Sequence, residues 1–180
     1  MTSRRTLPPI TAIVYPEGQH VDDLMRAIAD RLRADGVRLA GAVQINQTRP
    51  WRPKCDMTLV DLSSGREVRI SEDRGPEARG CRLDVAALDQ AMVMTAAGLA
   101  AGADLLIVNK FGKMEAAGRG FGPLIGEAIA DGVPVLIAVP EANVAAWDAF
   151  AGDYSAQHDL ADLGGPIGEV CTRLALAGRT

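Results

Sequence analysis

The chain has 180 residues and a net charge of −4, from 19 basic and 23 acidic side chains. Hydrophobic residues make up 48% of it but aromatic residues only 4%, which indicates one domain with an aliphatic core. The two signs of charge are interspersed, which argues against a nucleic-acid partner. No apolar run approaches the roughly 20 residues that a membrane helix needs, so we also expect no membrane partner.

The N-terminal and cysteine patterns indicate a cytoplasmic protein. Residues 3–6 (SRRT) resemble a twin-arginine export signal, but prolines at residues 8–9 interrupt the apolar segment that follows. The cysteines form neither an even set nor a CxxC pair, which is typical of a reducing compartment; they are Cys55, Cys81 and Cys171.

The first elements form the opening of a mononucleotide-binding unit. Residues 10–15 are β-branched and apolar between two prolines, which predicts a buried strand. A tight loop over residues 16–20 precedes a helix that begins near Val21 and ends at Gly36. Such a loop can cradle an anion, and its candidate ligands are Gly18, Gln19 and His20. The full GxxxxGK[ST] signature is absent.

A β-hairpin insertion over residues 41–83 follows a second strand, predicted for residues 37–44, in which Gly41 marks a bend or close approach. Residues 55–62 and 66–71 alternate between apolar and polar around a Ser-Ser-Gly turn, which predicts the hairpin. Two cysteines, Cys55 and Cys81, flank it and suit a thiol pair, soft-metal ligands or small buried hydrophobes.

The polar loop after this hairpin is rich in arginine. It suits either the bidentate capture of an oxyanion or a plain surface loop, and its cationic candidates are Arg74, Arg79 and Arg82.

Strands and helices alternate through the rest of the chain. We predict helices over residues 85–101, with Asp84 as N-cap, and over a segment ending at 131–132, with strands at 104–109 and 133–139. A short helix carrying Trp147 and Phe150 as packing residues follows, and a last helix is predicted for residues 167–177. This alternation predicts a three-layer α/β fold with a mostly parallel sheet and one domain over residues 1–180.

Polar residues gather where the strand at 104–109 ends. They are Asn109, Lys110, Lys113, Glu115 and Arg119. Because ligands of parallel sheets bind at the carboxyl ends of strands, this segment is the candidate binding surface. A glycine-rich loop with a solvated charge cluster is the competing interpretation.

Three segments together carry a family resemblance over nearly the full length: residues 55–57 (CDM), 80–84 (GCRLD) and 109–120, which includes NKFGKME and GRG. The chain resembles an uncharacterised bacterial domain-of-unknown-function family, which implies an association with molybdenum or nitrogen metabolism. More distantly, it is similar to the small P-loop nucleoside-triphosphatases first described from thermophiles. Those proteins read Asp-Glu-Ile-Gly-Lys/Pro-Met-Glu at the corresponding strand, so their two magnesium-site acids stand here as Asn109 and Lys110.

These departures imply that magnesium-dependent hydrolysis is absent or very slow. Cations at the strand end favour an anion, so Lys110, Lys113 and Arg119, with one arginine of the polar loop, are expected to surround a bare oxyanion or a nucleotide phosphate. A salt bridge from Lys110 to Glu115 or Glu17 is the alternative.

The sequence leaves three functions open. The first is a regulatory or accessory protein that binds a nucleotide or an oxyanion such as molybdate or phosphate. The others are a divergent nucleoside-triphosphatase or phosphoryl-transfer enzyme, and a protein-interaction partner in metal-cofactor insertion. A small anionic ligand is expected in the first two cases, with a protein partner or a homo-oligomer left open.

Overall fold

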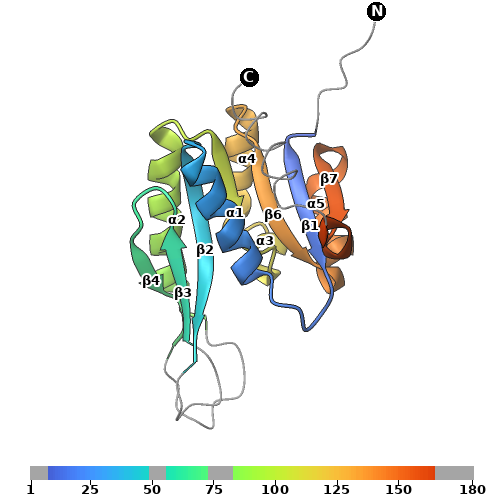
Figure 1. Cartoon of the computed structure of the whole chain (residues 1–180), viewed down its shortest axis with the longest axis horizontal. Coiled ribbons are helices and arrows are strands. Elements are labelled where there is room, and N and C mark those ends of the chain that lie inside the picture. The colour runs from blue at the N-terminus through green and yellow to red at the C-terminus, as the bar shows by residue number, and fades with distance from the viewer. Residues whose placement is uncertain (1–7, 49–55, 73–82, 165–180) are drawn as a thin grey trace, which may run out of the picture.

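A computed structural model describes residues 8–48, 56–72 and 83–164, and within these ranges one seven-stranded sheet runs through the molecule in the order β4-β3-β2-β5-β6-β1-β7 (Figure 1). Strands β2, β5, β6, β1 and β7 are parallel neighbours, whereas β3 pairs antiparallel with β2 and β4 with β3. The strands span Ile10–Tyr15 (β1), Leu39–Gln47 (β2), Asp56–Asp61 (β3), Glu67–Arg69 (β4), Leu105–Val108 (β5), Val135–Pro140 (β6) and Ser155–Asp159 (β7).

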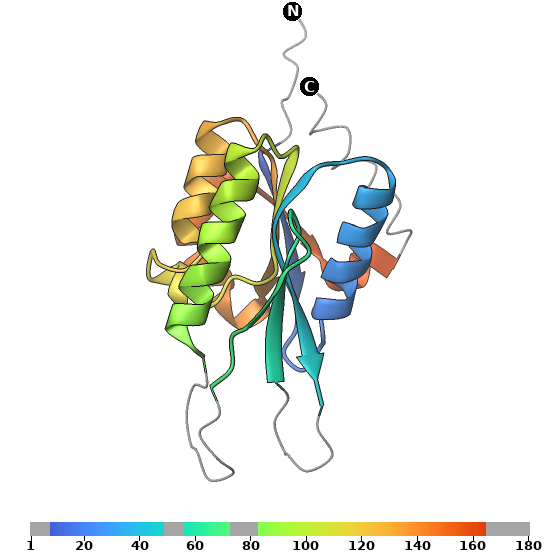
Figure 2. The same ribbon diagram turned by 90° about the vertical axis from the view of Figure 1, so that its left-hand side faces the viewer.

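Helices cover both faces of this sheet, which gives the expected three layers. Helix α1 lies on one face, and helices α2 and α4 lie on the other (Figure 2). The helices span Asp22–Ala34 (α1), Val85–Ala100 (α2), Lys113–Ala116 (α3), Gly122–Ala130 (α4) and Val144–Ala151 (α5). Asp84 caps α2 as predicted, because its carboxylate accepts a hydrogen bond from the Ala87 N–H at 3.0 Å.

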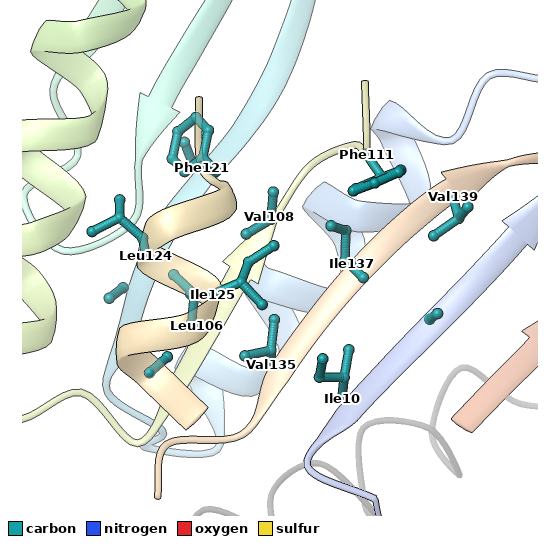
Figure 3. Packing of buried hydrophobic residues seen from close by; sticks show 14 of the residues in the cluster. Ile10, Leu106, Val108, Phe111, Phe121, Leu124, Ile125, Val135, Ile137 and Val139 are labelled. Carbon is teal, nitrogen blue, oxygen red and sulfur yellow. The ribbon is translucent and has the colours of Figure 1, made fainter. Parts of the chain in front are cut away.

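The two faces of the sheet belong to two separate apolar clusters. On the α1 face, Ile13, Leu105 and Ile107 pack against helix residues such as Met25 and Ile28. On the opposite face, Leu106 and Val108 of β5 and Val135 and Ile137 of β6 pack under Ile125 of α4 (Figure 3). Since adjacent strand residues point to opposite faces, the near-continuous apolar runs of β5 and β6 are what a strand covered on both sides requires.

The predicted hairpin is present as β3 and β4, and it extends the main sheet. Six residue pairs join β2 to β3, from Ala42 opposite Asp61 to Gln47 opposite Asp56. The second strand runs further than predicted, from Leu39 to Gln47, because its last three residues pair with β3 instead of entering a loop. The predicted final helix lies outside the described residues.

Strand β7 is absent from the sequence prediction. Its residues read SAQHD, with no apolar alternation, and they form an edge strand that pairs only with β1 in the described part of the chain. None of the helices in the described ranges is long and apolar enough to cross a membrane.

Candidate functional site

A closed network of polar side chains lies at the carboxyl ends of β5 and β2. The Asn109 side-chain amide follows β5, donates to Asp22 at 2.8 Å and accepts from the Gln44 N–H at 2.9 Å. Asn46 donates to the second Asp22 oxygen at 2.5 Å and accepts from the Gln44 amide at 2.8 Å. The network therefore ties the first residue of α1 to two strand ends and satisfies both oxygens of the Asp22 carboxylate.

This network joins the start of the first helix to the end of a strand. P-loop NTPases draw their magnesium ligands from those two kinds of position, with a Ser or Thr at the helix start and an acid at the strand end. Here Asp22 begins the helix and Asn109 follows the strand, and the Asn109 amide donates directly to the Asp22 carboxylate. Nearby, burial raises the pKa of Tyr15 to about 12, and the Asp22 charge adds to that rise.

Asn109→Asp should turn this closed network into a divalent-cation site. The substitution faces the Asp22 carboxylate with a second carboxylate at hydrogen-bond distance, and the repulsion should lower the free energy of unfolding by about 1–3 kcal/mol. Mg²⁺ or Ca²⁺ should recover much of that loss, which thermal melts with and without the ions would measure.

Gln157→Glu is the matched control for this experiment. Gln157 donates to Asp148 at 2.6 Å on an exposed part of the surface, so solvent screens the new charge pair. A melting temperature of Asn109→Asp that stays at the wild-type value and ignores both ions would contradict the interpretation of the network.

Glu115, predicted as a ligand-binding residue, is buried and bound to the backbone. One carboxylate oxygen accepts from the Gly112 N–H and the other from the Phe121 N–H, both at 3.0 Å. It stands at the third position of α3 and accepts from the N-cap backbone, which is the glutamate half of a capping box; the N-cap Gly112 has no side chain to form the other half. The carboxylate therefore shapes the loop that presents Lys110 and Lys113.

Aromatic packing fixes the other side of this loop. The Phe111 ring is fully buried and meets Trp147 edge-on, with ring centroids 5.0 Å apart, and Phe150 at 5.5 Å. The Asn143 side chain donates to the Phe111 carbonyl at 2.9 Å. Trp147 and Phe150 are thus packing residues, as predicted. Their contacts with the Phe111 ring and the Asn143 hydrogen bond fix the backbone directly after Lys110.

A cavity of about 580 Å³ opens beside this loop on the α2 side of the sheet. Its wall is mostly apolar, and its polar groups are few. The lining residues are Ala42, Gln44, Met57, Leu59, Ile70, Leu83, Leu88, Val108, Asn109, Lys110, Gly112, Lys113, Met114, Glu115, Phe121, Pro140 and Asn143.

Of the predicted site residues, the structure brings Asn109, Lys110, Lys113 and Glu115 together at this cavity. Arg119 is exposed and does not line it. The loop residues Gly18, Gln19 and His20 are also exposed and apart from the cavity lining, with the acidic Glu17 and Asp22 beside them. The remaining candidates lie outside the described residues; they are Arg74, Arg79, Arg82, Cys55 and Cys81.

The alternative salt bridge of Lys110 is wrong for the described part of the chain. Both Glu115 oxygens are taken by backbone N–H groups, and no ion pair joins Lys110 to Glu115 or Glu17 there. Lys113 likewise forms no ion pair within those ranges. Both lysines are exposed residues that line the cavity.

Sequence reasoning missed Asp22 and the two strand-end amides Gln44 and Asn46. An acid in the first turn of a helix, such as Asp22, is common and does not by itself indicate a site. The alternation of Gln44 and Asn46 at the end of β2 was a usable signal, because polar residues two apart at a strand's carboxyl end share one face.

The sheet order and its helices define an α/β domain with a fold of the P-loop NTPase type. The chain belongs to a family described as protein of unknown function (DUF2478), whose model matches residues 10–162. THEP1 from the hyperthermophile Aquifex aeolicus has a similar structure, with a TM-score of 0.57 at 16% sequence identity, over 92% of this chain and 98% of that one. This likeness shows the fold alone.

A second likeness is to part of a much longer protein. Over 143 residues, or 79% of this chain, the sequence is 41% identical to the molybdenum import ATP-binding protein ModC 2 of Bradyrhizobium diazoefficiens. The matched stretch is only 16% of that relative.

Proposed function

We propose that this protein is an anion-binding accessory protein that serves molybdenum uptake or use and hydrolyses nucleotides very slowly or not at all. The hydrogen bond from Asn109 to Asp22 carries this proposal, because the strand end that supplies a magnesium-binding acid in P-loop NTPases carries an amide here, and that amide is paired with Asp22. A phosphate on the loop at residues 16–20 would also meet the carboxylates of Glu17, Asp22 and Asp23 without a P-loop lysine to offset them.

The anion is expected at Lys110 and Lys113 instead. Both lysines are exposed at the cavity, and the carboxylate nearest to them in the chain, Glu115, is already saturated by backbone donors. The likeness to a segment of a molybdenum import ATP-binding protein supports an accessory role beside another protein's ATPase, with molybdate or a related anion as the small ligand.

Thermal-shift measurements against ATP, GTP, phosphate, sulfate, molybdate and tungstate, each with and without Mg²⁺, test the proposal. We expect stabilisation that does not require Mg²⁺ and that weakens in Lys110→Ala and Lys113→Ala by about tenfold or more in affinity, as for the loss of one charge-assisted hydrogen bond. Arg26→Ala, which removes an exposed cation of α1 away from the cavity, is the control and should respond like wild type.

Two results would overturn the proposal. Stabilisation by ATP only in the presence of Mg²⁺, together with measurable phosphate release, would favour the divergent nucleoside-triphosphatase. Ligand responses that survive unchanged in both lysine variants would show that the anion binds elsewhere.

A further inference from the structure

We infer that the cavity beside Lys110 and Lys113 binds a heterocyclic monophosphate, a flat ring system with N–H groups joined to a single phosphate. This inference rests on the proposed function and names the ligand of the same site. The ligand is either a purine nucleotide or a pterin phosphate, because both compounds join a flat ring system with N–H groups to a single phosphate.

The size of the cavity excludes a bare oxyanion as a full occupant. A water molecule takes about 30 Å³ in the liquid, and a tetrahedral oxyanion is only a few times larger. The cavity measures about 580 Å³. That volume falls within the range of pockets that enclose small organic ligands, about 300–1,000 Å³.

The apolar walls of the cavity favour a ligand with an apolar or aromatic part. Leu59 and Val108 come from the sheet, Leu88 from α2 and Phe121 from the start of α4, and all are buried members of the core cluster on this face. A hydrated oxyanion gains nothing from such walls, since they cannot replace the hydrogen bonds that it loses with water. The face of a ring does gain, because contact with the walls removes apolar area from water.

The polar groups in the wall fit the edge of a heterocycle. The Asn143 amide donates one of its two N–H groups to the Phe111 carbonyl, and Gln44 donates one of its two to Asn46. Within the described ranges the side-chain carbonyl oxygens of both residues make no hydrogen bond, and both residues line the cavity. Two free acceptors beside an apolar wall are suited to ring N–H or amino groups.

The charge at the rim selects one phosphate over a triphosphate. Lys110 and Lys113 supply two cations, while the strand end that carries an acid for the magnesium of a triphosphate in P-loop enzymes carries the Asn109 amide here. In P-loop enzymes a loop after the first strand cradles the β- and γ-phosphates. In this chain the loop after the first strand, residues 16–20, does not line the cavity and has acidic residues beside it. A single phosphate at the rim satisfies the two lysines.

Calorimetric titration of the full chain with GMP, AMP and neopterin monophosphate tests the inference, with ribose 5-phosphate as phosphate without the ring and guanosine as ring without the phosphate. We expect at least one ring phosphate to bind about tenfold or more tighter than both fragments and than orthophosphate or molybdate, because ring burial adds to the charge contacts. Comparison of the purine and pterin arms identifies the source.

A bulky substitution in the wall locates the site. Met57→Trp, at a half-buried wall residue, should weaken binding of the ring phosphate about tenfold or more and affect ribose 5-phosphate less. Val93→Trp, at a position on α2 that is 71% exposed and outside the cavity, is the matched control and should bind like wild type. If Met57→Trp does not fold, Met114→Trp fills the cavity from the loop side.

The outcomes separate this inference from the proposed function. If orthophosphate or molybdate binds through the two lysines and no ring phosphate binds tighter, the inference is wrong and the proposed function stands. If a ring phosphate binds tightly and both wall variants leave its affinity unchanged, the assignment of the cavity is wrong. If no anion in the panel binds, both fail together.

Discussion

Gly41→Ala is expected to destabilise the fold by more than about 4 kcal/mol, a loss large enough to leave much of the chain unfolded, since domains are typically stable by about 5–15 kcal/mol. Gly41 lies in β2 with φ +110°, a conformation that side chains rarely adopt, and a Cβ atom there would stand 1.8 Å from the Ile107 carbonyl oxygen. That oxygen belongs to the backbone of the neighbouring strand, so relief requires β2 and β5 to separate.

Urea denaturation at 25 °C measures this loss, with the soluble yield as a second readout. Gly126→Ala is the control, because Gly126 lies in α4 with open space around its Cα and without positive φ. There the same added methyl group should raise stability by up to about 1 kcal/mol through helix propensity. A Gly41→Ala protein within 1 kcal/mol of wild type would show that β2 and β5 can separate at little cost, contrary to our expectation.

Glu115→Ala is expected to cost about 2–4 kcal/mol and to weaken anion binding as well, because two backbone N–H groups lose their acceptors in a poorly hydrated place. The Gly112 N–H precedes Lys113, and the Phe121 N–H begins the segment that forms part of the cavity wall. Loss of the carboxylate therefore loosens both the rim and the wall. Glu115→Gln should cost less, because its single carbonyl oxygen can still accept from one of the two donors.

Chemical denaturation and the affinity for the best anion of the thermal-shift panel check this prediction together. Glu127→Ala, at an exposed glutamate of α4 that does not line the cavity, is the control and should change neither quantity appreciably. Wild-type stability in Glu115→Ala would mean that water replaces the carboxylate at both N–H groups. If Glu115→Ala is destabilised but binds the anion as tightly as wild type, the contacts of Glu115 with the backbone stabilise the fold without affecting the anion site.

Much of this fold could be predicted from the sequence, because several of its strands are largely apolar or roughly alternating. The runs at residues 105–108 and 135–140 are buried on both sides, and in β4 the buried Val68 stands between exposed Glu67 and Arg69. Strand β7 carries neither pattern. Its pairing with β1 is a tertiary interaction, and no local signal in SAQHD indicates it.

The candidate site was predictable in place and only partly in detail. Polar residues after β5 indicated the strand end, and the lysines do lie at the cavity. Whether Glu115 would face a ligand or a backbone N–H could not be decided from the sequence, because its N-cap residue is Gly112 and not the Ser or Thr of a capping-box signal. The pairing of Asp22 with Asn109 joins residues 87 positions apart, so only the fold reveals it.

The bonds to Asp22 also make positions 22 and 109 depend on each other during sequence change. An acid at position 109 meets the Asp22 carboxylate, and a hydroxyl residue at position 22 takes the shared carboxylate acceptor away from the amides of Asn109 and Asn46. Each single exchange is therefore expected to be less stable than the present protein, and the two positions are coupled. Only their simultaneous exchange would place a hydroxyl and an acid together there without first passing through a weakened fold.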